Sequence, residues 1–223
     1  MIFSVDTLDF SKPLDHLELF AGQMSVTRAE TQCGCNGFGP WGSEMDLATN
    51  AGFSNAVYKA CTLREGGAAL VAPVCSSWVF MSRGSTKRSD SCPMGDLNSP
   101  AVRLGNLLTA RTIVILMILA AQGVWFALEQ PSSSLMEKHV LFQRLVGLVS
   151  IRRMSIMMGD FAGPTLKPTW LYSSHVDVQD IERFKVARRL DPQREMVRHY
   201  QDGKGRARIT GGSALKSSQT YPR

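Results

Sequence analysis

Cys75 is the residue of this sequence whose type and position best suit nucleophilic chemistry. It follows the apolar segment AALVAPV (residues 68–74) and precedes a polar stretch. A thiol at such a boundary is partly exposed, and the nearby Arg83, Lys87 and Arg88 would favour its thiolate form. The alternative is a buried cysteine that packs as a small hydrophobic side chain. The residues alone leave both alternatives open.

Glu129 is the second candidate for a chemical role. It ends the apolar run VWFAL (residues 124–128) and is followed by Gln130 and Pro131. We therefore expect its carboxylate at the edge of a sheet, in the crevice where acids bind or protonate a ligand. A surface ion pair is the alternative.

A strand that runs into a glycine turn indicates a cofactor site. The turn precedes SVTRAE, which has the character of a helix start with a Ser cap, and such turns let a cofactor approach backbone amides. Asp46, roughly one β-α-β step later, could accept a ribose hydroxyl, with a helix cap before Leu47 as the alternative. The residues of the candidate turn are Leu19, Phe20, Ala21 and Gly22.

The elements that must position these residues alternate between strands and helices. This order is typical of an α/β fold with a Rossmann-like, doubly wound and mostly parallel sheet, whose ligands bind at the carboxyl ends of the strands. A second strand is expected to end near residues 44–46, and Gly66-Gly67 to stop a helix that begins at Asn50. The other expected strands are 15–22, 68–74, 124–131 and 168–174, and the other expected helices are 25–30, 101–122 and 138–151.

Composition limits the class of protein. The chain has 223 residues, of which 44% are hydrophobic and 20% charged, and this excludes a wholly disordered, collagen-like or coiled-coil protein. The odd number of cysteines (5) and the lack of a C-x-x-C pair argue against a disulfide framework and against a metal site. The N-terminus has no basic region typical of a signal peptide. The apolar run at residues 113–128 is short for a membrane span, so we expect it in the core.

The charge is concentrated at the C-terminal end. Residues 181–223 contain eleven Lys and Arg against four Asp and Glu, although the whole chain has a net charge of only +6. We therefore divide the chain into a Rossmann-like domain (1–175) and a basic, irregular C-terminal segment (176–223), in which residues 177–190 can form a charged helix. Such a segment favours contact with a polyanion, and a solvated tail is the alternative.

Taken together, three segments resemble the cytosine-C5 DNA methyltransferases. ELFAG (18–22) is similar to the first motif of that family, APVCSS (72–77) to its proline-cysteine motif, and LEQP (128–131) stands where the family has glutamate-asparagine-valine. KPTWLYSS (167–174) is similar to a late strand of phage-type relatives. Within the family, the sequence is most similar to methyltransferase-like proteins of dinoflagellates and other algae.

The resemblance implies S-adenosylmethionine as the cofactor and no metal. It implies that Cys75 is the nucleophile that adds to C6 of a flipped-out cytosine. It also implies that Glu129 binds the N3/N4 edge of the base. The cofactor would be bound by the turn, Pro73 and Asp46. The nucleic-acid-binding residues would be Arg83, Lys87, Arg88, Lys167, Arg206 and Arg208.

Two classes of function follow from these observations. The first is an enzyme that methylates cytosine C5 in DNA; methylation of an exocyclic amine fits the motifs less well. The second is a methyltransferase-like module that binds nucleic acid without catalysis. DNA is the expected partner, with RNA as the alternative, no membrane contact is expected, and the expected location is intracellular, in the nucleus if DNA is bound.

Overall fold

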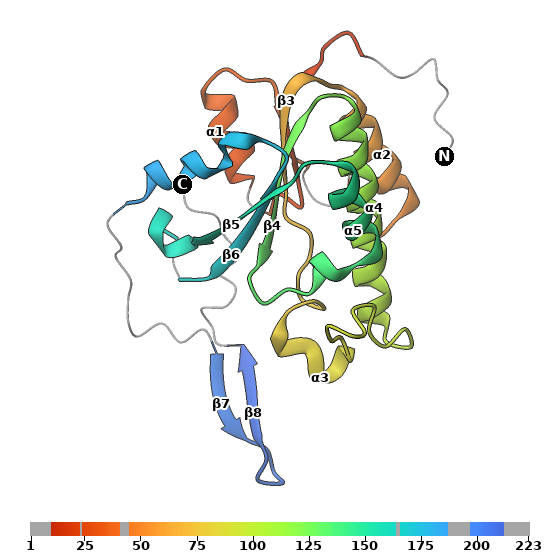
Figure 1. Ribbon diagram of the computed structural model, residues 1–223, viewed down its shortest axis with the longest axis vertical. Helices are drawn as coiled ribbons and strands as arrows, with labels where there is room; N and C mark the ends of the chain where they lie inside the picture. Colours follow the sequence, from red (N-terminus) through yellow and green to blue (C-terminus); the bar gives the residue numbers. More distant parts are fainter. Residues whose placement is uncertain (1–9, 23, 41–44, 164–165, 187–196, 212–223) are drawn as a thin grey trace.

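A six-stranded β-sheet lies at the centre of the protein, with its strands in the order β2-β1-β3-β4-β6-β5 (Figure 1). The computed structural model describes residues 10–22, 24–40, 45–163, 166–186 and 197–211. The strands of the sheet are β1 (Leu14–Leu19), β2 (Gly37–Phe38), β3 (Leu63–Val71), β4 (Trp125–Pro131), β5 (Arg152–Met157) and β6 (Pro168–Ser173).

Five of these six strands run in one direction. The pairs β1–β2, β1–β3 and β3–β4 are parallel, whereas β6 is antiparallel to both of its neighbours, β4 and β5. The chain places β2 on one side of β1 and then crosses to place β3 on the other side, so the strand order reverses between β1 and β3. The predicted Rossmann-like, mostly parallel α/β fold is confirmed.

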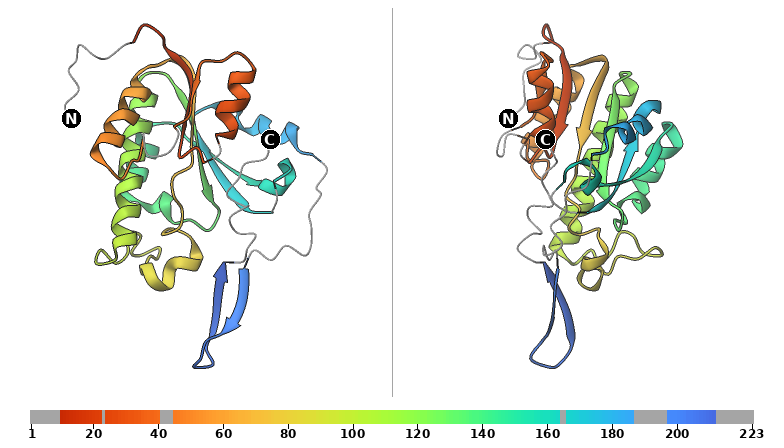
Figure 2. Two further views of the ribbon diagram at one scale, coloured as in Figure 1. Left: turned by 180° about the vertical axis from the view of Figure 1, so that it is seen from behind. Right: turned by 90° about the vertical axis from the view of Figure 1, so that its left-hand side faces the viewer.

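Helices lie on both faces of the sheet. One face, which we call the back, is covered by the helices α2, α4 and α5, to the right of the sheet in Figure 1; the other face, which we call the front, carries α1 and the 3₁₀ helix η5, to its left (Figures 1 and 2). The helices are α1 (Ser25–Gln32), α2 (Asn50–Cys61), α3 (Arg83–Thr86), α4 (Pro100–Ala121) and α5 (Val140–Leu148), and the short 3₁₀ helices are η2 (Phe80–Ser82), η3 (Met136–Lys138), η4 (Met158–Phe161) and η5 (Val176–Phe184).

The main hydrophobic core lies between the back face and its helices. Side chains alternate between the two faces of a strand, so Leu17 and Leu19 of β1 and Phe126 and Leu128 of β4 all point to the back. They are buried together with Leu116 of α4 and the other residues of the core cluster. This packing is what holds the carboxyl ends of the central strands in place.

Helix α4 contributes more to this core than any other helix. By length and composition it could cross a membrane, but 50% of its most apolar 18-residue stretch is buried inside the protein. It ends before Gly123, whose positive φ of 70° reverses the chain into β4. The segment 113–128 is therefore core helix followed by core strand, as predicted.

Several elements differ from the sequence-based predictions. The second strand that the structure describes is the short β2 (37–38); Met45 lies in a turn, and residues 41–44, on which the predicted strand end partly falls, lie outside the described residues. Helix α2 ends at Cys61, and Gly66-Gly67 lie inside β3, where Gly66 has a φ of 69° and the pairing with β1 is irregular. The sequence could not distinguish these two cases, because a pair of glycines can lie at a β-bulge as well as at the end of a helix.

The C-terminal part also differs from prediction. Strand β5 was not predicted, and the charged segment after Ser173 forms the 3₁₀ helix η5 rather than an α-helix, with residues 187–190 outside the described residues. Further along, β7 (Val197–Gln201) and β8 (Ala207–Gly211) pair as an antiparallel hairpin that extends away from the sheet (Figure 1). The division of the chain at residue 175 stays a prediction.

Core packing of α4 predicts a sharp contrast between two leucines of the same helix. Leu116 is 0% exposed and Leu104 is 45% exposed. Leu116→Ala should lower the free energy of unfolding by about 2–5 kcal/mol, because it leaves a cavity under the sheet. Leu104→Ala, which makes the same change in helix propensity, should cost less than about 1 kcal/mol. Urea unfolding followed by circular dichroism measures both, and equal losses would contradict this packing.

Candidate active site

The candidate site lies at the carboxyl edge of the sheet, where the strand order reverses between β1 and β3. Such a reversal leaves a crevice outside the carboxyl ends of parallel strands, and ligands of α/β proteins bind there. The two strands stay paired to their ends, since the Ala72 amide donates to the Leu19 carbonyl at 3.2 Å. The glycine turn after β1 and the Pro73–Cys75 segment after β3 therefore leave the sheet side by side.

Cys75 lies four residues beyond Val71, the end of β3, and is partly buried. Its carbonyl accepts hydrogen bonds from the amides of Trp78, at 2.8 Å, and Val79, at 3.2 Å, which fixes the turn that follows. Burial raises the pKa of the Cys75 thiol; the positive charge of Lys167 acts against this shift, and Glu129 adds to it. Cys75 is therefore a thiol at rest, and a cation is available to favour its thiolate.

Glu129 and Lys167 form an ion pair beside Cys75. The Lys167 Nζ lies 3.0 Å from Glu129 Oε1, and the two side chains are only 19% and 7% exposed. Among the described residues, no hydrogen bond of good geometry reaches this Oε1, so it keeps capacity to accept one. The pair comes from the end of β4 and the residue before β6, two strands that are direct neighbours. It is a buried ion pair, not the surface pair considered as an alternative.

Gln130 joins the Cys75 segment to β4. Its side chain is buried, its Nε2 donates to the Pro73 carbonyl at 2.7 Å, and its Oε1 accepts from the Ser134 hydroxyl at 2.8 Å. Both polar ends of the amide are therefore satisfied, and the loop that carries Cys75 is tied to the strand that carries Glu129. Sequence reasoning did not select Gln130, although a polar residue beside Glu129 at the end of an apolar strand was a signal.

The turn after β1 has an unusual backbone. Phe20, Gly22 and Met24 all have positive φ values, of 58°, 52° and 53°. Left-handed conformations are costly for residues other than glycine, and such strain is typical of functional sites. A side chain at Gly22 would meet no atom within 4 Å, so the space beside this glycine is open. A ligand can therefore approach the backbone of the turn.

Glu18 is a site residue that sequence reasoning missed. It is 1% exposed, and its Oε2 accepts hydrogen bonds from the amide and the hydroxyl of Thr27, both at 2.8 Å. Glu18 thus accepts a hydrogen bond from a backbone amide in the first turn of α1. The expected Ser25 cap is absent there, and Met24 occupies the cap position. Its other oxygen, Oε1, is buried without a hydrogen-bond partner among the described residues. The signal was an acid between two leucines of a buried strand.

Asp46 lies outside the described strands. It is exposed in the turn before α2, and its Oδ1 accepts from the Ala48 amide at 2.9 Å. The cap of α2 is Thr49, whose hydroxyl accepts from the Gly52 amide, so the alternative of Asp46 as the helix cap is also wrong. A role of Asp46 in binding a ribose stays a prediction without support from the turn that holds it.

The structure contradicts the prediction that Arg88 binds nucleic acid. It is 2% exposed, its guanidinium lies 3.3 Å from the centre of the Trp78 ring, and it donates to the carbonyls of Ser77, Pro93 and Val102. Burial lowers its pKa to about 10, so it stays charged at neutral pH. Arg88 holds the loop between β3 and α4 together and is not available to a phosphate.

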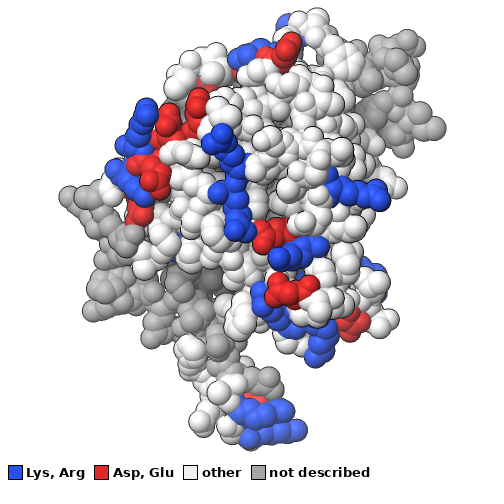
Figure 3. All heavy atoms as spheres, viewed as in Figure 1, with Lys and Arg blue, Asp and Glu red and all other residues white. Residues whose placement is uncertain are grey.

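The other basic candidates have different surroundings. Arg83 is partly buried and lies over the ring of Phe80, whereas Lys87 is exposed and donates to the Gly84 carbonyl. The cation that lowers the pKa of Cys75 is Lys167, not Arg83, Lys87 or Arg88 as the sequence suggested. In the hairpin, Arg206 forms an ion pair with Asp202, and Arg208 of β8 lies opposite Tyr200 of β7. Figure 3 shows Lys and Arg gathered at the far end of this hairpin.

Comparisons with known proteins give a limited result. No protein-family model matches the sequence, and no curated protein matches it either. Among solved structures, the chain is similar to the crystal structure of the Dnmt2 methyltransferase of S. pombe, with a TM-score of 0.46 and 11% identity. The match covers 83% of this chain and 62% of that one, so the chain spans less than two thirds of the length of that methyltransferase. The predicted similarity to algal proteins stays a prediction.

The burial of Arg88 predicts a loss of stability rather than of nucleic-acid binding. Arg88→Ala leaves three carbonyls without their donor and should lower the free energy of unfolding by about 2–4 kcal/mol. Lys87→Ala, at the exposed neighbouring position, should change it by less than about 0.5 kcal/mol. Denaturant unfolding of the two variants measures the difference. A stable Arg88→Ala protein would show that the buried contacts are wrong.

The charges beside Cys75 predict opposite shifts of its reactivity. Lys167→Met removes the charge that lowers the pKa of Cys75, so the midpoint of alkylation should move to higher pH. Glu129→Gln removes the charge that raises this pKa, so the midpoint should move to lower pH. Iodoacetamide labelling, read by mass spectrometry at Cys75, measures both midpoints, with the exposed Cys92 as the internal reference. Shifts in the same direction would refute the arrangement.

Proposed function

We propose that the protein is an S-adenosylmethionine-dependent methyltransferase that acts on cytosine C5 in DNA. The observation that carries this proposal is the meeting of Cys75, Glu129 and Lys167 at one edge of the sheet, beside the turn that follows β1. A nucleophile, a base-binding acid and a cation are the groups that addition to a pyrimidine ring requires. All three come from segments that the resemblance in sequence had selected.

Cys75 and Lys167 would carry the nucleophilic step. The positive charge of Lys167 favours loss of the thiol proton to solvent, and the thiolate forms a bond to C6 of a cytosine taken out of the helix. The electron pair of the C5–C6 double bond then moves towards C5, which becomes nucleophilic. After C5 has received a methyl group, loss of its proton and cleavage of the S–C6 bond restore the ring and the thiolate.

Glu129 would hold the base during this step. Its buried carboxylate has an oxygen with free capacity to accept, and the exocyclic amine of cytosine is a donor. The positive charge of Lys167 compensates the negative charge of this buried carboxylate. Gln130 fixes the distance between Glu129 and the Cys75 segment through its bond to Pro73. It is therefore a positioning residue.

The turn after β1 fits the cofactor that the resemblance implies. S-adenosylmethionine, when bound, would supply the methyl group. The buried Oε1 of Glu18 lacks a partner and suits the ammonium of an amino-acid moiety, and the open space beside Gly22 admits a ligand to the backbone. The rest of the cofactor-binding surface would be formed by Leu19, Phe20, Ala21 and Pro73.

DNA as the substrate is supported by the chemistry of the site and by the distribution of charge. The exposed Lys87 and the basic end of the β7–β8 hairpin are the cations that could reach phosphates (Figure 3). RNA presents the same base and phosphate chemistry and is the alternative substrate. A DNA substrate would place the protein in the nucleus.

One observation favours a second function, a nucleic-acid-binding module without catalysis. Burial raises the pKa of Cys75, so that most of the protein carries a thiol and not the thiolate that the reaction needs. In that case the fold would act as a scaffold, and nucleic acid would bind equally well when Cys75 is replaced by serine.

Two measurements test the proposal. Calorimetry should find S-adenosylmethionine binding with a Kd on the order of micromolar for both the wild type and Cys75→Ser, because Cys75 lies outside the cofactor turn. A DNA duplex with cytosine fluorinated at C5 should form a covalent adduct with the wild type in the presence of the cofactor, because the fluorine blocks the release step. Cys75→Ser should form no adduct, and Cys92→Ser should form it normally.

Absence of cofactor binding would overturn the methyltransferase proposal. Cofactor binding without an adduct would show that Cys75 is not the nucleophile. Equal DNA affinity of wild type and Cys75→Ser, with neither cofactor binding nor adduct, would identify the binding module.

A further inference from the structure

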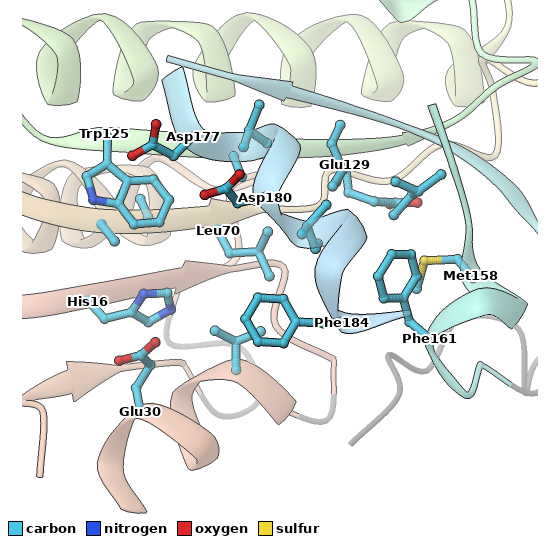
Figure 4. A pocket seen from close by; sticks show the side chains of 18 of the residues that line it. His16, Glu30, Leu70, Trp125, Glu129, Met158, Phe161, Asp177, Asp180 and Phe184 are labelled. Atoms are coloured by element: carbon cyan, nitrogen blue, oxygen red, sulfur yellow. The ribbon is translucent and has the colours of Figure 1, made fainter. Parts of the chain in front are cut away.

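A large cavity lies on the front face of the sheet, between α1 and η5 (Figure 4). Its volume is about 660 Å³, within the range of about 300–1,000 Å³ that is typical of small-molecule sites. Of the candidate active-site residues, only Glu129 lines it; the turn after β1 and Cys75 do not. The cavity therefore adjoins the candidate active site at Glu129 but includes neither the cofactor turn nor the nucleophile.

The sheet is hollow here because small side chains occupy its centre. His16, Ala68 and Trp125 lie side by side in one row across β1, β3 and β4, and Leu70 and Ala127 lie side by side in the next row. The alanines leave the space between α1 and η5 unfilled. On the back face, large apolar side chains fill the corresponding space under α4.

One end of the cavity carries its polar groups. His16 is 4% exposed, and its Nε2 is buried without a hydrogen-bond partner among the described residues. Figure 4 shows its imidazole pointing into the cavity, with Glu30 on one side and Asp177 and Asp180 on the other. Burial lowers the pKa of His16, against the opposing effect of Glu30 and Glu18, so its ring is neutral at neutral pH. A neutral imidazole nitrogen can accept a hydrogen bond.

The charge of this end is negative. Glu30, Asp177 and Asp180 line this end, and among the described residues the lining includes neither Lys nor Arg. Asp177 also contacts His175, and Asp180 also contacts Arg183. Both partners are exposed and do not line the cavity. Glu30 contacts the thiol of Cys35, which carries no positive charge. A cation is therefore favoured in the cavity, and an anion is excluded.

The other end of the cavity is apolar and aromatic. Met158 and Phe161 of η4 and Phe184 of η5 face the space around Leu171 and Ile156 (Figure 4). At the polar end, the indole of Trp125 offers an aromatic face to a cation. The two ends together match a ligand with a flat or apolar body and a single cationic group.

We propose that this cavity is a binding site for a small aromatic cation, with the ammonium near His16, Glu30 and Asp180 and the aromatic body between Phe161 and Phe184. The ammonium donates to His16 Nε2 and satisfies the one buried nitrogen that lacks a partner there. The proposal is independent of the methyltransferase activity, since it uses neither Cys75 nor the turn after β1.

Three naphthalene compounds of matched size test the proposal: naphthylmethylammonium, the neutral naphthylmethanol and the anionic naphthylacetate. Calorimetry at neutral pH should show the ammonium compound binding to the full chain about tenfold more tightly than the alcohol, and the anion more weakly than both. S-adenosylmethionine affinity, measured in parallel, distinguishes this site from the cofactor turn.

Two pairs of variants locate the site. Ala68→Leu fills the polar end of the cavity and should weaken binding of the ammonium compound at least about tenfold. Ala101→Leu, at an exposed position of α4, should leave binding unchanged. Glu30→Gln should reduce the preference for the ammonium compound over the alcohol severalfold, whereas Glu65→Gln, at an exposed position of β3, should not.

The outcomes separate clearly. If the wild-type chain does not bind the ammonium compound, the proposal is wrong. Equal affinity for all three compounds overturns the assignment of a cation. Binding that Ala68→Leu leaves intact, in a variant with a normal melting temperature, places the ligand elsewhere and also overturns the proposal.

Discussion

The parallel pairing of β1 with β3 is the constraint on which the rest of the structure depends. It carries the reversal of strand order, and it brings the ends of two segments about fifty residues apart into direct hydrogen bonding at Leu19 and Ala72. Everything that we assign to the candidate active site leaves the sheet within a few residues of this contact or from the adjacent β4. The core on the back face maintains the pairing, because Leu17, Leu19 and Val71 are buried under α2 and α4.

Buried charges with specific partners surround this edge. Glu18 is satisfied by Thr27, Glu129 by Lys167 and Arg88 by three carbonyls and the Trp78 ring. A buried charge is tolerated only where such partners exist, and removal of one partner is costly. These pairs therefore stabilise the loops at the carboxyl edge, and the remaining capacity of Glu18 Oε1 and Glu129 Oε1 to accept hydrogen bonds marks where a ligand could bind.

The two faces of the sheet differ in how they are covered. On the back, α2, α4 and α5 pack over large apolar side chains, whereas on the front the described helices α1, η4 and η5 surround alanines, a histidine and an aromatic residue. The asymmetry has a direct consequence: stability comes mainly from the back, and space for ligands is left at the carboxyl edge and on the front. Glu129 lies where these two spaces adjoin.

The sequence by itself determined the elements with strong local patterns and the residues at their ends. The apolar runs of β1, β4 and α4, and Cys75 and Glu129 just beyond strands, follow from hydrophobicity and turn residues within single segments. The tertiary structure decided the partners: Lys167 beside Cys75, Gln130 on Pro73, Arg88 inside a loop, and the reversed β6 next to β4. These depend on contacts between residues distant in the chain, and a local pattern contains no information on which distant side chain will fill a given space. The same reason explains why composition marked Arg88 as a surface cation, since only the surrounding carbonyls and the Trp78 ring make its burial favourable.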